Sequence, residues 1–231
     1  MLTADELGII VLSLKVALVS VALSLPPAIA IAYLLARADF PGKMLLDAVV
    51  HLPLVLPPVV VGFALLLLFG RHGPIGGWLD RWFGIVLVFR WTGAALAAAI
   101  MGFPLMVRAI RLSFSAIDRR FETVARTLGG SRLSVLFSVT LPLAMPGVVT
   151  GAVLSFARSL GEFGATITFV SNIPGETQTL PLAIYTYTQV PGGDAQAWRL
   201  SAMAVILSIA ALMAAEWIAR RKAPSTGGAV A

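Results

Sequence analysis

Two pairs of ionisable residues lie four positions apart within strongly apolar sequence. Arg158 precedes Glu162, and Asp47 precedes His51. On a helix this spacing places both members of a pair on one face, where they can form an ion pair or a hydrogen bond. Charged side chains at membrane depth are costly and usually face protein or water. The Arg158–Glu162 pair is therefore expected either to fix helix packing or to line a gate or a subunit interface.

The pair of Asp47 and His51 has two interpretations. One is a proton relay, and the commoner one is a hydrogen-bonded histidine near the membrane surface. Small and hydroxyl-bearing residues follow the Arg158–Glu162 pair in the stretch GEFGATIT. Gly164 and Thr166 in this stretch could bring two helices or two subunits into close contact. The alternative is that the hydroxyl groups face a transported solute.

Sequence motifs for covalent or hydrolytic chemistry are absent from the chain. It contains no G-x-x-x-x-G-K-[ST] phosphate-binding loop, so it cannot itself be an ATPase. It contains no H-E-x-x-H or G-x-S-x-G motif and no cysteine, which excludes thiolate metal sites and iron–sulfur clusters. We expect neither catalysis nor a bound cofactor.

The stretch FETVARTLGGSRLSVLFSVTLPLAMPG, residues 121–147, begins with a short predicted helix. Asp118 is expected to cap its N-terminus, and Glu122 suits the positive end of the helix dipole. Gly129 stands where a left-handed C-terminal cap is expected. Ser131 can cap a second helix that re-enters the membrane near Leu141.

One face of the short helix is apolar. The i, i+3, i+4 and i+7 spacing of a helical face is occupied by Phe121, Val124, Ala125 and Leu128. Arg126 lies on the other side, together with Glu122. A helix this short is not stable alone, so its apolar face needs a surface. The membrane surface and a groove on a soluble partner are both candidates.

The elements that position these residues are predicted to be membrane helices. The chain has 231 residues, of which 58% are hydrophobic and 12% charged, with a mean hydropathy of +0.93. A soluble domain carries about twice that share of charged residues. The apolar runs are continuous and lack the alternation of barrel strands, so we predict an all-α polytopic membrane protein. In such a chain the net charge of +6 does not indicate nucleic acid.

Five spans are predicted, and prolines interrupt four of them. Their approximate bounds are 7–36, 45–69, 92–107, 143–170 and 198–219. The prolines and the GEFGAT stretch predict bent helices with incompletely satisfied backbone, which is tolerated only where protein or water covers it. This density of breaks favours a translocation pathway over an inert anchor. The run FGIVLVF at 83–89 is too short to cross and is predicted to lie at the interface or outside the membrane.

The distribution of Lys and Arg predicts the orientation. With the 121–147 loop on the cytoplasmic side, eleven of these residues fall inside and four outside, at Arg71, Arg81, Arg90 and Arg199. The N terminus is therefore predicted outside and the C terminus in the cytoplasm. Residues 161–197 contain no Lys or Arg. The later part of this external segment could dock a partner protein or cover the helices as a lid.

The stretch ETVARTLGGSRLSVLFSVTLP resembles the cytoplasmic loop of permease subunits of bacterial ABC importers. The family pattern is Glu-Ala-Ala, three residues, Gly, nine residues, Ile, any residue, Leu-Pro. From Gly129 onward the match is close, with Val139 in the Ile position and Leu141 before the proline. The first half departs from the pattern, because Thr123 occupies the Glu position and Glu122 stands one place earlier.

Further stretches are similar to the permease of the molybdate importer in particular. They are FPGKMLLDAVVHLPLVLPPVVVGFALLLLFG, FPLMVRAIRLSFSAID and FARSLGEFGATITFVSNIPGETQTLPLAIYTY. The resemblance extends from about residue 12 to residue 220. It implies a type I ABC-importer permease fold, with residues 1–231 forming one transmembrane domain and residues 118–142 forming a coupling loop within it.

The resemblance also implies an assembly in the bacterial inner (cytoplasmic) membrane. Two copies of the permease would join two cytoplasmic ATPase subunits and an external molybdate-binding protein, surrounded by membrane lipid and without nucleic acid. The short helix would be the coupling helix, docked in a groove of the ATPase. Its expected contact residues are Phe121, Glu122, Val124, Ala125, Arg126, Leu128 and Gly129.

The candidate residues of the pathway or gate are Arg158, Glu162, Gly164 and Thr166. Two alternatives to a molybdate importer stay open. The first is a permease for tungstate, which has nearly the same size and shape as molybdate, or for sulfate, whose branch of the family looks similar. The second is an ion-coupled secondary transporter, which would be expected to carry paired carboxylates in mid-membrane or repeated halves; neither is evident.

Overall fold

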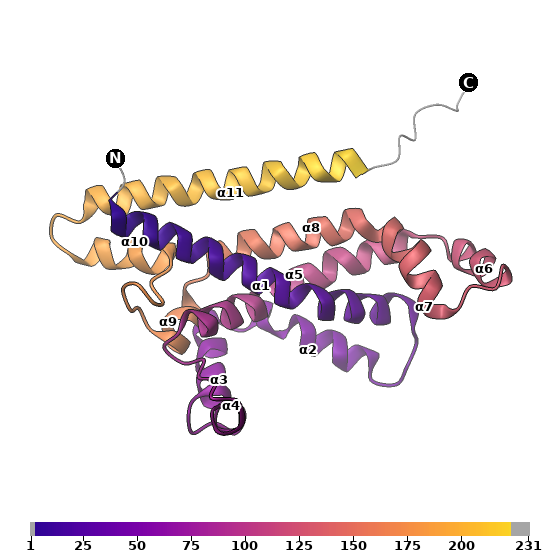
Figure 1. Ribbon diagram of the computed structural model, residues 1–231, viewed down its shortest axis with the longest axis horizontal. Coiled ribbons are helices and arrows are strands. Elements are labelled where there is room, and N and C mark those ends of the chain that lie inside the picture. The colour runs from indigo at the N-terminus through magenta and orange to yellow at the C-terminus, as the bar shows by residue number, and fades with distance from the viewer. Residues whose placement is uncertain (1–2, 223–231) are drawn as a thin grey trace.

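In the computed structural model, which describes residues 3–222 and their side chains as far as residue 214, the chain is built from helices (Figure 1). They are α1 (Ala4–Arg37), α2 (Lys43–Val55), α3 (Pro58–Phe69), α4 (Pro74–Phe83), α5 (Trp91–Ala116), α6 (Arg119–Thr127), α7 (Arg132–Val135), the π-helical turn η1 (Leu136–Thr140), α8 (Leu141–Leu160), α9 (Gly164–Val170), α10 (Leu180–Gln189) and α11 (Asp194–Lys222).

Within the described residues, four helical stretches are long and apolar enough to cross a membrane alone. They are Ala4–Arg37, Trp91–Ala116, Arg132–Leu160 and Asp194–Ala214, and the bent pair of α2 and α3 makes a fifth candidate span. The long helices lie side by side, with α6 and α7 at one end and α9 and α10 at the other (Figure 1). This arrangement confirms the predicted all-α fold with about five spans.

The second predicted span, 45–69, is not one helix. It divides into α2 and α3, whose axes differ by 114° across the break at residues 56–57. Leu56 is extended at the break, as expected for a residue before proline. Figure 1 shows α3 leaving the bundle sideways.

Pro104 is the proline expected to interrupt the third predicted span, 92–107, and this expectation is wrong, because α5 continues through Pro104 to Ala116. Pro104 is buried in the bundle, where neighbouring helices keep its disturbed backbone away from lipid. The fourth span also differs from its predicted bounds of 143–170. Its helix begins at Arg132 and ends at Leu160, and α9 is a separate short element.

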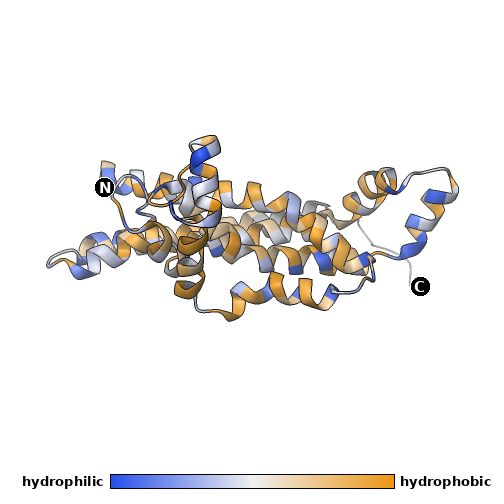
Figure 2. Cartoon of the chain, turned by 90° about the horizontal axis from the view of Figure 1, so that it is seen from below, coloured by the Kyte–Doolittle hydropathy of each residue, from blue (hydrophilic) through white to orange (hydrophobic). Residues whose placement is uncertain are grey.

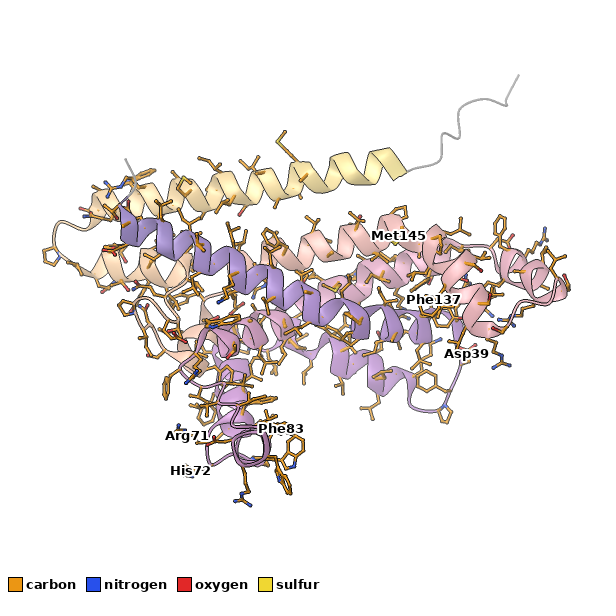
Figure 3. The ribbon with its side chains drawn as sticks, in the orientation of Figure 1. Asp39, Arg71, His72, Phe83, Phe137 and Met145 are labelled. Atoms are coloured by element: carbon orange, nitrogen blue, oxygen red, sulfur yellow. The ribbon has the colours of Figure 1, made fainter. Side chains whose placement is uncertain are left out.

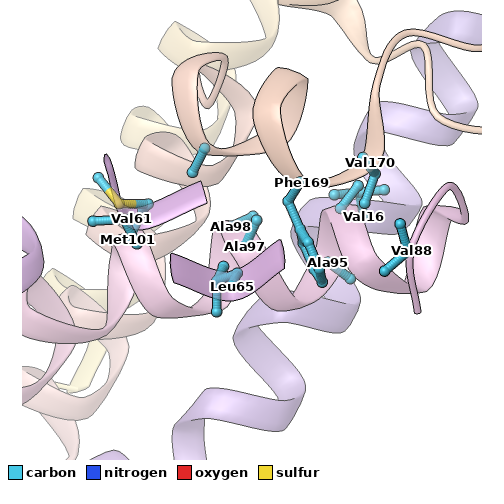
Figure 4. Close-up of a cluster of buried hydrophobic side chains, with 12 residues drawn as sticks. Val16, Val61, Leu65, Val88, Ala95, Ala97, Ala98, Met101, Phe169 and Val170 are labelled. Carbon is cyan, nitrogen blue, oxygen red and sulfur yellow. The ribbon is translucent and has the colours of Figure 1, made fainter. Parts of the chain in front are cut away.

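The core of the bundle is centred on α5, which packs between α1 and α8. One buried cluster joins its alanine-rich first half to α1, α3 and α9, with Val16, Leu65, Ala97 and Phe169 among its members (Figure 4). Most residues in the middle of the bundle are hydrophobic, whereas polar residues gather mainly towards its two ends (Figure 2). This distribution is the one expected for a bundle that spans a bilayer.

The first and last long helices are joined by an ion pair that local sequence does not reveal. Glu6 is fully buried, and its Oε1 lies 2.7 Å from Nη2 of Arg199 at the start of α11. The other carboxylate oxygen of Glu6 accepts a hydrogen bond from the backbone N–H of Thr3, which completes a capping box.

Candidate functional site

The sequence correctly predicts both ends of the short helix α6. The Asp118 side chain accepts a hydrogen bond from the backbone N–H of Arg120 at 2.9 Å and caps its N-terminus. Gly129 has a φ of +88°, the left-handed conformation expected beyond the end of a helix. The Ser131 side chain accepts from the backbone N–H of Ser134 and caps α7. Tight caps at both ends therefore fix the position of α6 in the turn.

The predicted apolar face of α6 points away from the rest of the chain. Phe121 and Val124 are each 58% exposed, and Leu128 is 83% exposed, whereas Ala125 is half-buried. We call the three exposed side chains the apolar ridge of α6. Exposed apolar residues in a row on a short helix indicate a surface that a partner protein or the membrane covers.

Glu122 faces the opposite way and is only 7% exposed. Its Oε1 lies 3.1 Å from Nε of Arg37, the last residue of α1, and accepts a hydrogen bond from the Thr140 hydroxyl at 3.2 Å. Arg37 also donates from Nη2 to the backbone carbonyl of Ile117. A single carboxylate thus ties α6 to the end of α1 and to η1.

Arg37 is the site residue that sequence reasoning misses. In the sequence it counts only as one of the positive charges of the loops, and 85 positions separate it from Glu122. The one signal is that Arg37 ends a long apolar run, at the same end of the membrane as the 121–147 loop. A cavity of about 410 Å³ opens beside the pair, with Arg119, Arg126 and Arg132 also in its wall. The polar surroundings of α6 are therefore strongly basic.

Arg158 and Glu162 form the predicted pair, with Nη1 and Oε2 2.7 Å apart. Glu162 lies in the break after α8 and is only 2% exposed. Its Oε1 accepts a hydrogen bond from the backbone N–H of Ala165 at 2.9 Å, in the first turn of α9. The carboxylate therefore balances one arginine and also satisfies a free donor of the broken helix.

Gly164 lies where the two broken spans touch. A Cβ atom on Gly164 would lie 2.7 Å from Cβ of Pro58, the first residue of α3. A Cβ atom on Gly62 would likewise lie 2.5 Å from the carbonyl oxygen of Ala165. Thr166 is buried in the same region. The start of α3 and the start of α9 thus meet backbone to backbone, which only glycine permits.

Asp47 and His51 belong to an ion-pair cluster at the start of α2. Oδ1 of Asp47 lies 2.7 Å from Nη1 of Arg111, and Nδ1 of His51 lies 2.8 Å from the Asp47 carbonyl oxygen. This is the hydrogen-bonded histidine of the commoner interpretation. Among the side chains described, those of residues 3–214, no three His, Cys, Asp or Glu gather where they could hold a metal ion.

The segment between α9 and α11 packs onto the bundle. Thr177 and Leu180 are buried, and the backbone N–H of Leu180 donates to the Ser13 hydroxyl of α1 at 2.7 Å. Asn172 and Gln178 both donate to the hydroxyl of Thr186. These contacts support the interpretation of this segment as a lid over the helices.

Comparison with known proteins shows which family has this sequence and architecture. Residues 28–224 match the family described as "Binding-protein-dependent transport system inner membrane component". The chain is 58% identical over 219 residues to the "Molybdenum transport system permease protein ModB" of Escherichia coli (strain K12), covering 95% of this chain and 96% of that protein. It is 55% identical to the protein of the same name from Haemophilus influenzae, covering 96% and 97% of the two chains.

Solved structures of two transporters share the fold at low sequence identity. A chain of a bacterial alginate ABC transporter aligns with a TM-score of 0.75 and 16% identity, over 95% of this chain and 80% of that one. A chain of the MetNI methionine ABC transporter, in an inward-facing conformation, aligns with a TM-score of 0.73 and 14% identity, over 96% and 100%. The fold is that of type I ABC-importer permeases, and the chain belongs to the family of inner membrane components of binding-protein-dependent transport systems.

Proposed function

We propose that this chain is the permease subunit of an ATP-driven importer that moves molybdate across the bacterial inner membrane. The observation that carries the proposal is the 58% identity, over 95% of the chain, to a permease named for molybdenum transport. The chain has no phosphate-binding loop, so a separate subunit must hydrolyse ATP. Membership of a binding-protein-dependent family implies an external binding protein as well.

The assembly contains two copies of this chain, two ATPase subunits on the cytoplasmic side and one external molybdate-binding protein. Residues 1–231 act as one permease domain, and residues 118–142 are its coupling loop. The apolar ridge of α6 supports this assignment, because an exposed apolar helix face fits a groove on a partner. Arg126, on the side of α6 away from the ridge, is half exposed and suits acidic groups at the rim of such a groove.

The buried pair of Glu122 and Arg37 connects α6 to the end of the membrane helix α1. ATP-driven closure of the two ATPase subunits draws the two copies of α6 together. Because Glu122 is fixed to Arg37 and Thr140, a displacement of α6 moves the end of α1 and the turn η1 with it. Breaking a buried ion pair is costly, so the three elements move as one body.

Arg158, Glu162, Gly164 and Thr166 lie along the pathway or its gate. The contact between the two broken spans supports this placement, since irregular backbone at membrane depth is found where it lines a cavity or is covered by protein. Arg158 is balanced by Glu162, so a doubly charged oxyanion meets no uncompensated positive charge here. Such an anion is well held by neutral backbone and hydroxyl donors.

Uptake of labelled molybdate tests the function. The full chain is reconstituted in vesicles with its ATPase and its binding protein, and ATP is supplied on the ATPase side. We expect ATP-dependent uptake that excess tungstate suppresses and excess sulfate leaves nearly unchanged. Equal competition by sulfate would assign the chain to the sulfate branch. Uptake driven by an ion gradient without ATP would contradict the importer altogether.

A further inference from the structure

The helices α3 and α4, with residues 84–90 that follow them, form an arm at the side of the bundle (Figure 1). The 114° bend between α2 and α3 directs the arm away from the long helices. Arg71, His72 and Phe83 lie on its outer part (Figure 3).

Helix α4 is amphipathic. Its apolar residues follow the i, i+3, i+4, i+7 and i+8 spacing of one face, and they are Ile75, Trp78, Leu79, Trp82 and Phe83. Most of this face is open, with Trp82 70% exposed. Asp80 and Arg81 lie on the other side of the helix. A soluble surface would not present two tryptophans in this way without a partner.

Basic and aromatic residues on two long helices indicate the level of the membrane surface. Lys15 and Arg37 are 22 residues apart on α1, and a helix of that length is about 33 Å long. Trp91 and Arg111 are 20 residues apart on α5, which gives about 30 Å. Both values match the hydrocarbon thickness of about 30 Å. Nζ of Lys15 lies 3.7 Å from the ring centre of Trp91, so the two helices mark the same boundary.

The arm joins the bundle at this boundary. Val88 packs in the same buried cluster as Val16, which is adjacent to Lys15. Phe89 and Arg90 immediately precede Trp91 and line a cavity of about 660 Å³ against the end of α3 and the residues that lead into α4. Helix α4 is therefore attached at the level where hydrocarbon gives way to lipid headgroups, on the side of the membrane opposite to α6.

The charges of the arm suit lipid phosphates. Arg71 is paired only loosely, with Nε 3.9 Å from Oδ2 of Asp80. Within the part of the chain that the structure describes, Arg81 and Arg90 form no ion pair. Tryptophan beside basic residues is the composition found at the membrane–water interface.

We propose that α4 lies flat in the headgroup region of the outer leaflet, as an interfacial anchor for the bent second span. Trp78, Trp82 and Phe83 reach the part of the acyl chains next to the headgroups, and Arg71, Arg81 and Arg90 contact lipid phosphates. The anchor holds the free end of α3, whose other end meets α9 at Gly164. This inference depends on the membrane location of the chain and does not depend on the identity of the substrate.

The chain lacks cysteine, so single spin labels can test the depth of each face. Trp82→Cys labels the apolar face, and Arg81→Cys is the matched control on the polar side. The full chain is reconstituted in vesicles of phosphatidylethanolamine and phosphatidylglycerol. We expect the label at 82 to collide more with oxygen than with a water-soluble nickel chelate, and the label at 81 to show the reverse. Equal access of the chelate to both labels would overturn the proposal.

Exclusion of both reagents from the label at 82 would mean that protein covers this face, and would also overturn the proposal. A second measurement needs no label. Lipids with brominated acyl chains quench tryptophan fluorescence, and the Trp78→Phe, Trp82→Phe double variant should lose a substantial part of the quenching seen in the unmodified chain. Unchanged quenching would place the two tryptophans outside the bilayer.

Discussion

Nε of Arg37 and Oε1 of Glu122 lie 3.1 Å apart, although 85 residues separate them in the chain. Each side chain is only 9% exposed. The pair joins the end of the first membrane helix to the short helix that we assign to ATPase coupling. Glu122 therefore points into the permease, while the apolar ridge of α6 points out of it.

Removing one charge of this pair should be more harmful than removing both. Glu122→Gln leaves the Arg37 charge buried without a counter-ion, which costs about 3–5 kcal/mol of stability. We expect a lower unfolding temperature and a large loss of molybdate uptake. The Arg37→Gln, Glu122→Gln double variant should recover much of the stability, because no buried charge is left unpaired.

Asp80→Asn is the control for this experiment. It removes an exposed pair whose atoms are 3.9 Å apart, and exposed pairs contribute only about 0–1 kcal/mol. A double variant of Arg37 and Glu122 that is stable yet transports poorly, while ATP is still hydrolysed, would identify the pair as a mechanical connection. Equal stability of the Glu122→Gln variant, an Arg37→Gln single variant and the unmodified chain would show that the pair does not stabilise the protein.

Gly129→Pro should abolish uptake and leave membrane insertion intact. The φ of +88° at Gly129 cannot be reached by proline, whose ring holds φ near about −65°. The substitution disturbs the turn that sets the angle of α6, and no span contains it. Insertion is measured by protease protection, and uptake by labelled molybdate. Gly8→Ala is the control, because a Cβ atom there has no neighbour within 4 Å; normal uptake by Gly129→Pro would contradict the coupling role.

A cysteine at Val124 should form a crosslink to the ATPase. Val124 lies on the apolar ridge, and the chain has no other cysteine to compete. Arg126→Cys, on the other side of α6, is the matched comparison and should crosslink less. Protection of the Val124→Cys thiol by lipid, with no ATPase adduct, would favour a helix that rests on the membrane surface.

Gly164→Ala should destabilise the bundle and impair uptake, whereas Gly161→Ala should do neither. A Cβ atom at 164 would lie 2.7 Å from Pro58, but one at 161 would have no neighbour closer than 4.0 Å. Overpacking of this kind costs about 1–3 kcal/mol. Thermal unfolding of the purified variants measures the difference. Similar unfolding temperatures for the two variants would show that α3 and α9 can separate without cost.

The sequence predicts those parts of the structure that depend on neighbouring residues. Apolar runs predict the spans, and Asp118, Gly129 and Ser131 predict the caps around α6, because these features are local. The Arg158–Glu162 pair is also local, at four positions. By contrast, the partners of Glu122 and Glu6 come from distant parts of the chain, and no spacing rule connects them.

The effect of the prolines on the helices is also not predictable from neighbouring residues alone. Pro26 and Pro104 both lie inside continuous helices, while Pro57 and Pro58 mark a 114° bend. All of them look alike in the sequence. Whether a proline breaks a membrane helix depends on whether the carbonyl groups that it frees find other partners. Burial of the proline alone does not decide this, because Pro104 is buried but Pro26 is exposed. That depends on tertiary packing, which local patterns do not contain.

Gly62 and Ala165 bring the two interrupted spans into direct contact, through α3 of the second span and α9 of the fourth. The backbones of α3 and α9 meet at this point, with no side chain between them. We expect a tilt of α3 to displace α9, and with it the Glu162 carboxylate that accepts a hydrogen bond from the first turn of α9. We therefore expect the outer parts of the second and fourth spans to move together as one unit.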